Sequence, residues 1–324
     1  MIRYPITKAN LEAKISDAQN DWLERAKAKT DHFVAMGEYK EPKGESIWGE
    51  IKKVFIEIQF DKCAYCEREL GGVDNSGEYD VEHYRPKSSI KMWPTKSIRR
   101  RRKLANYGFP TGDKSDKGYY RLAYNICNYA ATCKRCNSSL KSNYFPVAQP
   151  RIFDSDDYTV LSGEEPYLLF PVGDADQDDP EEIMTFFGFL PVLKAQDGRR
   201  YKRGLVTIDF FSLATRDELI RDRANIIVDM WERHEILKDN SASAELRARA
   251  QAGIDRAILD ERPHANCARA YNLLCRQDPV SAFRWYKHAL PHSEKVKNKE
   301  FFEKLDQLKE YFHEKSFIRS IFGW

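Results

Sequence analysis

The most distinctive chemical feature of this chain is a set of paired cysteines. Cys63 and Cys66 are separated by two residues, and Cys133 and Cys136 repeat that spacing 67 positions further on (133 minus 66). Two intervening residues let both sulfurs of a pair face one ion, and four thiolates are the ligand set of a closed tetrahedral zinc site. Because the protein would fill every position, we expect this Zn²⁺ to be structural. Two separate redox pairs are the alternative interpretation.

An acidic residue and a histidine stand side by side between the two cysteine pairs. From Asp80 to Lys87 apolar and polar residues alternate, which predicts a strand that runs into a turn. On an extended segment Glu82 and His83 point to opposite sides, so they can serve different tasks. A single histidine is more often structural than catalytic, but this one lies beside a carboxylate and between two predicted zinc knuckles.

Two asparagines flank the second cysteine pair. The stretch from Leu122 to Cys133 predicts a strand that leads into this pair, and residues 138–143 predict the start of a helix. Asn137 directly follows a predicted zinc ligand, and an amide oxygen held in this way is a suitable ligand for Mg²⁺. Asn128 and Asn137 also have a plainer interpretation as residues that cap or close turns.

Basic residues gather between the histidine and Asn128. The net charge of +3 is too small to indicate a nucleic-acid-binding protein, so the argument depends on local clustering. A run of charge usually forms a solvated surface, but a run that is nearly all positive and close to a candidate active site favours contact with a nucleic-acid backbone. The candidate contacts in this segment are Arg85, Lys87, Arg99, Arg100, Arg101 and Arg102, and Arg135 in the second cysteine pair is a further candidate.

The composition describes a globular protein and argues against several other classes. Of the 324 residues, 42% are hydrophobic and 32% are charged, which is unlike a disordered or fibrous chain. The sequence has no apolar run of 18 residues and no signal-peptide core at its start, so we expect a cytoplasmic protein without membrane contact. An odd number of cysteines, seven, argues against a disulfide framework.

Hydrophobic periodicity predicts an α+β protein that is mostly helical. Apolar residues recur at helical spacing over 10–36 and 48–60, and again after Thr215, including Phe301, Leu305, Leu308 and Phe312. Phe186–Val192 predicts one short strand. We therefore expect an N-terminal helical segment (1–60), a module with the cysteine pairs (61–150), a connector with a small sheet (151–213) and a C-terminal helical region (214–324).

The segment from about Lys62 to Pro146 resembles the HNH endonucleases, which share a ββα-metal core. The resemblance rests on four cysteines that flank an acid–histidine pair and two asparagines. It implies that His83 is the general base and that Glu82 and Asn137 hold a catalytic Mg²⁺ or Mn²⁺. It also implies that Asn128 braces the loop, and that a zinc-stapled core is embedded in the helical protein.

Longer motifs narrow the resemblance to one branch. Cys-Ala-Tyr-Cys-Glu, Asp-Val-Glu-His-Tyr-Arg-Pro-Lys and Cys-x-x-Cys-Asn with a trailing Phe-Pro are similar to the HNH subunit of Septu-type and retron-linked anti-phage systems. The usual partner of that subunit is an ABC-type ATPase, and its expected substrate is DNA. Asn137 replaces a histidine and Glu82 replaces the commoner aspartate, but both keep an oxygen ligand. Leu140 is an extra residue before Lys141, where the family spacing is Cys-Asn-x-x-Lys, which leaves a phosphate contact by Lys141 open.

Two classes of function compete with the nuclease. A zinc-ribbon protein that binds nucleic acid or acts as a scaffold would need the cysteines, but it would have no use for a histidine beside a carboxylate. A redox protein would need free dithiols, which a bound zinc removes. The sequence therefore favours a metal-dependent endonuclease.

Overall fold

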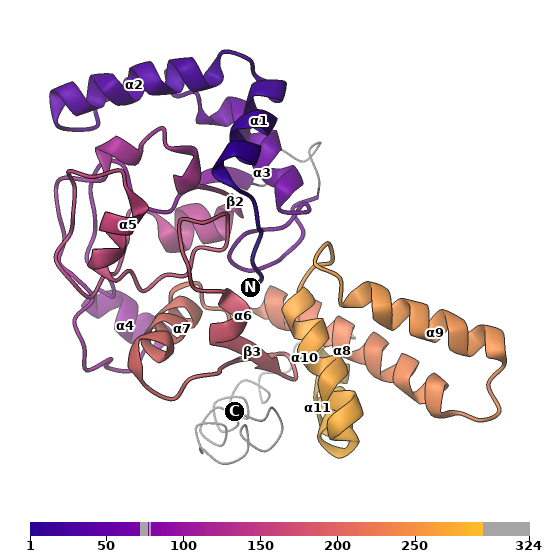
Figure 1. The fold of residues 1–324 in the computed structure, drawn as a ribbon. Helices are drawn as coiled ribbons and strands as arrows, with labels where there is room; N and C mark the ends of the chain where they lie inside the picture. The colour runs from indigo at the N-terminus through magenta and orange to yellow at the C-terminus, as the bar shows by residue number, and fades with distance from the viewer. Residues whose placement is uncertain (72–76, 78, 294–324) are drawn as a thin grey trace. The chain divides into compact units, whose positions relative to one another are not determined.

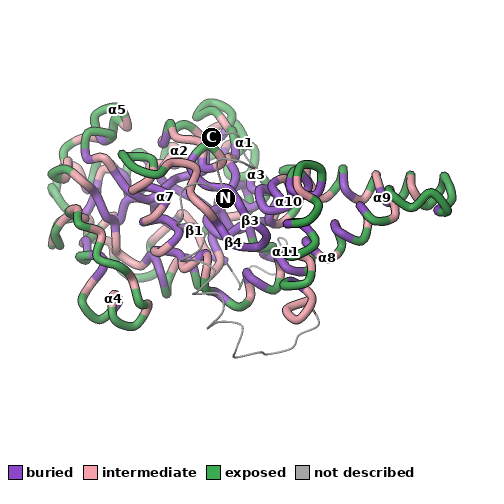
Figure 2. The backbone as a smooth tube through the Cα atoms, turned by 90° about the horizontal axis from the view of Figure 1, so that it is seen from below, coloured by how far each residue is buried: buried purple, intermediate pink, exposed green. Residues whose placement is uncertain are grey.

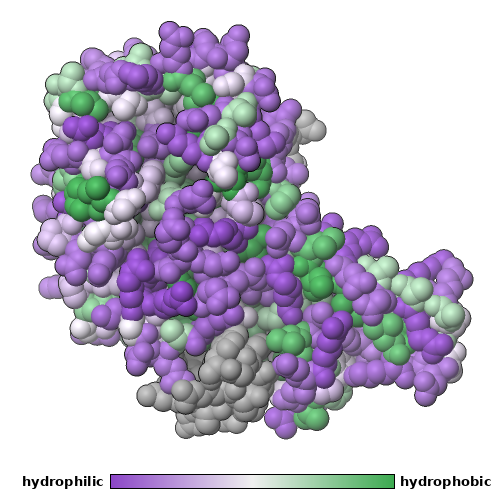
Figure 3. Space-filling model, in the orientation of Figure 1, coloured by the Kyte–Doolittle hydropathy of each residue, from purple (hydrophilic) through white to green (hydrophobic). Residues whose placement is uncertain are grey.

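The computed structural model describes residues 1–71, 77 and 79–293. They form two compact units, which we describe separately: Met1–Pro180 with Lys202–Phe211, and Glu181–Tyr201 with the chain from Ser212 onward. Helices and two small antiparallel sheets make up these residues, which confirms the predicted α+β class. No helix among them combines the length and apolar character needed to cross a membrane. The face in view in Figure 3 is mostly hydrophilic.

The first unit opens with two helices where the periodicity predicts one helical stretch. α1 (Lys8–Ala18) and α2 (Trp22–Met36) are separated by a short break (Figure 1). The Thr7 hydroxyl caps α1 by accepting a hydrogen bond from the Asn10 N–H at 3.2 Å. Gly37 ends α2 in the left-handed region at φ 72°, which glycine adopts without steric cost.

A third helical segment leads to the first cysteine pair. The 3₁₀ turn η1 (Trp48–Ile51) continues into α3 (Lys52–Ile58), and this confirms the helix predicted over 48–60. Val54, Phe55 and Ile56 of α3 are buried. In Figure 1, α3 lies beside strand β2 (Tyr129–Cys133).

Two antiparallel strands and a short helix form the centre of the first unit. β1 (Tyr79–His83) pairs with β2 in a register that runs from Tyr79 opposite Cys133 to His83 opposite Tyr129. Helix η5 (Arg135–Lys141) follows β2 almost directly and is a π-helix. The predicted strand from Leu122 is wrong in its first half, because η3 (Tyr120–Leu122) and η4 (Ile126–Asn128) are 3₁₀ turns.

Short helices and the buried side chain of Arg203 complete the description of the first unit. α4 (Lys96–Arg102), α5 (Tyr158–Leu161) and η6 (Ser162–Glu164) lie in long connections. α7 (Gly198–Phe210), which the sequence analysis did not predict, belongs to this unit from Lys202 onward and contributes Arg203. The buried Arg203 guanidinium contacts the carboxylates of Asp176 and Asp178, and its Nη2 donates to the Leu168 carbonyl at 2.9 Å.

The second unit is a hairpin with helices. β3 (Met184–Phe187) and β4 (Leu190–Leu193) pair antiparallel around Gly188, so the single predicted strand over 186–192 is wrong and is a hairpin instead. Residues 301–312, predicted to be helical, lie outside the described residues. Figure 2 shows that much of α9 is exposed. The helices are α6 (Pro180–Ile183), which begins at the boundary of the two units, α8 (Asp217–Lys238), α9 (Ala244–Ala257), α10 (Ala265–Gln277) and α11 (Pro279–Ser293), and they confirm the helical prediction after Thr215.

Removing the buried Arg203 charge should destabilise the first unit. Arg203→Met leaves the carboxylate of Asp176, itself 8% exposed, without its counter-ion. We expect a loss of about 3–5 kcal/mol in the free energy of unfolding, measured by urea denaturation. Lys14→Met, at an exposed position of α1 in the same unit, is the control and should change it by less than about 0.5 kcal/mol. Equal unfolding midpoints for the two variants would contradict the assignment.

Candidate functional site

Four cysteine sulfurs converge in the first unit. The Sγ atoms of Cys63, Cys66, Cys133 and Cys136 all lie within 4.8 Å of one another, and those of Cys66 and Cys133 are 3.9 Å apart. A tetrahedral zinc with bonds of about 2.3 Å places its sulfurs about 3.8 Å apart. The donor set and its spacing therefore fit a structural Zn²⁺. In the described part of the chain, these cysteines are the one group of three or more His, Cys, Asp or Glu residues close enough to share an ion.

A buried glutamine ties the first cysteine pair to the central sheet. Gln59 is fully buried at the end of α3, and its Nε2 donates to the carbonyls of Lys62 and Ala131 at 2.9 and 2.8 Å. Its Oε1 accepts the Ala131 N–H at 2.8 Å, and the Ala64 N–H donates to the Ala131 carbonyl at 3.1 Å. The knuckle that carries Cys63 is thus fixed to the middle of β2. The sequence analysis missed Gln59, because its partner on β2, Ala131, is 72 positions away.

The ring of His83 has a fixed orientation at the end of β1. It makes edge contacts with Trp48 and Tyr129, both at 4.9 Å between centroids, and only 7% of the residue is exposed. His83 Nε2 lies 3.0 Å from the Ala123 carbonyl, which also accepts the Tyr129 hydroxyl at 2.5 Å. A carbonyl only accepts hydrogen bonds, so Nε2 carries the hydrogen and Nδ1 carries the lone pair.

The environment also keeps His83 neutral. Burial, followed by the positive charge of Lys87, holds the pKa of His83 well below its ordinary value, against the opposing effect of the Ala123 carbonyl. A neutral imidazole with a free nitrogen can accept a proton from water. The contacts of Trp48, Ala123 and Tyr129 were missed by the sequence analysis, although Tyr129 directly follows the predicted Asn128.

The carboxylate of Glu82 is buried against one lysine. Its Oε1 lies 3.2 Å from Lys141 Nζ, and the two side chains are 5% and 0% exposed. Lys141 Nζ also donates to the His83 carbonyl at 3.3 Å. Burial raises the pKa of Glu82 to about 7, and Lys141 opposes that rise. The charge of Lys87 also opposes the rise, and Lys141 is the cation in direct contact. A hard anionic oxygen in the interior suits a divalent cation such as Mg²⁺.

Helix η5 carries two further residues of the predicted site, Asn137 and Lys141. Asn137 is half-buried, and its backbone carbonyl accepts the Ser142 N–H at 2.7 Å, the five-residue spacing of a π-helix. Lys141 lies four positions after Asn137, about one turn further along the helix. Since the Lys141 ammonium reaches Glu82, this helix docks on β1 beside the acid–histidine pair.

Asn128 joins the segment after β1 to the turn before β2. It is fully buried, and its Oδ1 accepts the Arg85 N–H at 2.8 Å. Its Nδ2 donates to the carbonyls of Arg85 and Leu122 at 3.0 and 3.2 Å. Asn128 therefore connects these two segments through three hydrogen bonds, and its role in the candidate site stays a prediction.

The predicted substrate contacts lie in different environments. The Arg85 guanidinium is buried and its Nε is 3.2 Å from a Glu164 carboxylate oxygen, whereas Lys87 is half-buried with its Nζ 4.4 Å from the Trp48 ring centroid. Arg102 donates to the Phe210 carbonyl at 2.8 Å. Arg99 and Arg102 are partly exposed, and Arg100, Arg101 and Arg135 are exposed. The phosphate contacts of all these residues remain predictions.

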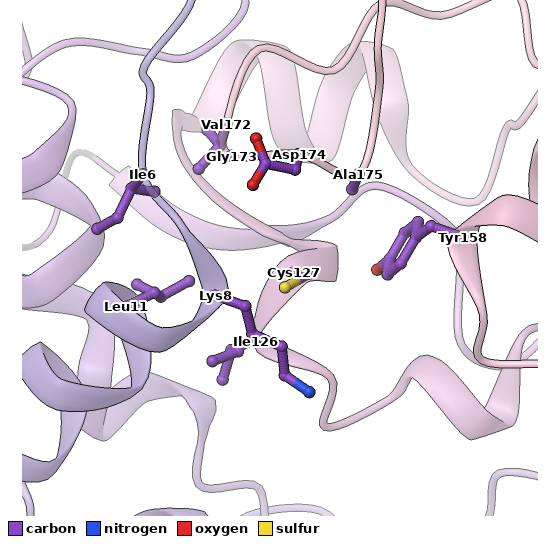
Figure 4. A pocket seen from close by; sticks show the side chains of 10 residues that line it. All are labelled: Ile6, Lys8, Leu11, Ile126, Cys127, Tyr158, Val172, Gly173, Asp174 and Ala175. Carbon is purple, nitrogen blue, oxygen red and sulfur yellow. The ribbon is translucent and has the colours of Figure 1, made fainter.

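A small cavity lies next to the turn that ends at Asn128. It has a volume of about 120 Å³ and contains the Cys127 side chain (Figure 4). Burial raises the pKa of Cys127, so its thiol stays protonated and is a poor nucleophile. The cavity brings together no set of groups suited to catalysis. Its other lining residues are Ile6, Lys8, Leu11, Ile126, Tyr158, Val172, Gly173, Asp174 and Ala175.

Loss of one cluster cysteine should remove the metal and weaken the fold. Cys133→Ser takes away one of four thiolates, and a structural zinc site contributes folding free energy directly. We expect about one zinc per wild-type chain by mass spectrometry of the bound metal, and in the variant loss of most of this zinc and a lower unfolding temperature. Cys127→Ser, outside the cluster, is the control and should keep both. Unchanged metal content and melting in Cys133→Ser would rule out this site.

Comparison with known proteins gives two relatives with the same name. Septu protein PtuB of Bacillus mycoides (strain KBAB4) is 28% identical over 256 residues, which cover 78% of this chain and 75% of the relative. Septu protein PtuB of Bacillus thuringiensis is 23% identical over 236 residues, 68% of this chain and 67% of the relative. No family model matches the chain, and no solved structure matches it. Over most of its length, the chain is therefore similar in sequence to these two Septu PtuB proteins.

Proposed function

We propose that this PtuB homologue is a metal-dependent HNH endonuclease that acts in anti-phage defence. The single observation that carries the proposal is the fixed tautomer of His83, one residue from a buried carboxylate and on the strand that pairs with the cysteine-bearing β2. The order β1, β2 and η5 agrees with a ββα-metal core. DNA is the proposed substrate.

In this mechanism His83 Nδ1 accepts a proton from water as the water attacks phosphorus. The Ala123 carbonyl holds the Nε2–H and would stabilise the ring when it becomes positively charged. Glu82 and Asn137 would hold a Mg²⁺ or Mn²⁺, which supplies charge neutralisation at the phosphate and the leaving oxygen. The products would carry 5′ phosphates. The four cysteines would hold a Zn²⁺ that takes no part in the chemistry.

The surroundings of His83 support an enzyme over a zinc-ribbon scaffold. A protein that only binds nucleic acid has no need for a neutral imidazole whose tautomer is fixed by a buried carbonyl, or for a carboxylate that is costly to bury. Arginines on α4 and Arg135 would contact the phosphate backbone without reading sequence.

A partner is proposed from the resemblance to Septu-type systems. There the nuclease subunit works with an ABC-type ATPase, so we propose that such an ATPase activates or delivers this chain. The helices after Thr215 offer surfaces for this contact and, among the described residues, no cluster of metal ligands.

Replacing the general base should abolish cleavage but preserve the protein. In His83→Ala we expect cleavage of plasmid DNA with Mg²⁺ or Mn²⁺ to fall about 100-fold or more, with zinc content and DNA binding unchanged. The assay includes the partner ATPase. His32→Ala, an exposed histidine on α2, is the matched control. Cleavage by His83→Ala at the wild-type rate would refute the mechanism.

Asn137→Ala tests the metal site separately from the base. Because this change weakens a ligand set and leaves His83 in place, we expect activity lost at low Mn²⁺ to recover in part at high Mn²⁺. A titration of cleavage rate against Mn²⁺ concentration measures this. No dependence of the defect on Mn²⁺ would argue against Asn137 as a ligand.

A further inference from the structure

We infer that Lys141 is the built-in counter-ion of Glu82 and competes with the divalent metal for this carboxylate. Metal binding would then release the Lys141 ammonium toward the substrate phosphate. The inference rests on the proposed metal site and assigns a role at that site to Lys141.

The ion pair is the first observation. Lys141 Nζ is 3.2 Å from Glu82 Oε1, and the lysine side chain is fully buried. Its Nζ also donates to the carbonyl of His83 on the same strand at 3.3 Å, and it lies 5.8 Å from the Phe145 ring centroid. One ammonium therefore sits directly against the carboxylate proposed to bind the metal, and a cation placed on that carboxylate would face a positive charge at close range.

The helix geometry is the second observation. Lys141 follows Cys136, a member of the cysteine cluster, by five positions. An α-helix brings residues four apart into line, and a π-helix does so for residues five apart. Helix η5 is a π-helix, so its wider turn places Lys141 on the side of the helix that contacts Glu82.

The chemistry of the lysine follows from this placement. An ammonium is a compact, mobile point charge on a flexible stem, so it can neutralise a buried carboxylate and later move to a phosphate oxygen. A carboxylate left alone in the interior would be costly, which gives the metal-free protein a reason to hold this pair. Lys141 would thus exchange one anion for another when metal and substrate arrive.

The test measures Mn²⁺ binding to the zinc-loaded full chain by calorimetry, without substrate. Lys141→Met and Lys141→Gln remove the charge, and the glutamine keeps a donor for the His83 carbonyl. We expect both to bind Mn²⁺ about tenfold or more tightly than the wild type, because the competing charge is gone. Lys53→Met, which removes an exposed charge from α3, should bind Mn²⁺ as the wild type does.

A third variant separates the two proposals. If Glu82→Gln binds Mn²⁺ as well as the wild type does, the proposed metal site itself is wrong. If Glu82→Gln loses binding but the Lys141 variants bind Mn²⁺ equally well or more weakly than the wild type, the competition is wrong and the metal site stands.

A measurement on the wild type does not depend on whether the variants fold. Acetylation of Lys141 by an amine reagent, followed by mass spectrometry, should be slow in the zinc-loaded protein and faster after Mg²⁺ is added, since the ammonium leaves its buried partner. Labelling of Lys141 that does not rise with Mg²⁺ would overturn the release. Lys53 labelling is the internal control.

Discussion

The convergence of four cysteine thiols is the constraint on which the rest of the first unit depends. One pair lies in the turn after α3, and the other spans the end of β2 and the start of η5. These segments are short, and two five-residue strands could not hold them in place alone. The cysteine cluster brings the turn after α3, strand β2 and helix η5 together at one point. This fixes the position of η5 beside the end of β1 that carries Glu82 and His83.

Buried ion pairs in the first unit provide a second level of organisation. Glu82 meets Lys141, Arg85 meets Glu164, and Arg203 meets two aspartates. The Glu164 carboxylate has several partners, because it also accepts hydrogen bonds from the Tyr119 hydroxyl at 2.7 Å and the Ile152 N–H at 2.6 Å. Glu82 differs, since its direct ion-pair partner is a flexible lysine, Lys141, and the charge of Lys87 acts on it as well. Glu164 is therefore suited to stabilising the fold, whereas Glu82 is suited to exchanging its lysine partner for another cation.

His83 illustrates how a fold turns an ordinary residue into a potential base. The imidazole is oriented by a carbonyl from the turn before β2, by a tyrosine on β2 and by a tryptophan from η1. None of these groups is charged, so they fix the ring and its tautomer while burial keeps it neutral. The Tyr129 hydroxyl on the same carbonyl makes that acceptor part of a small network instead of an isolated contact.

The sequence by itself determined what depends on short spacing. Two Cys-x-x-Cys pairs, the adjacent Glu82 and His83, and the helical periodicity over 48–60 and after Thr215 are local patterns, and the structure has the cysteine cluster and those helices. Only the tertiary structure decided what depends on partners far along the chain. Ala123 is 40 positions from His83, and Lys141 is 58 positions from the His83 carbonyl it contacts. The π-helix is a further example, since its wider turn brings Lys141 to Glu82. Local helix propensity cannot predict such a contact, because it forms only when segments remote in sequence pack together.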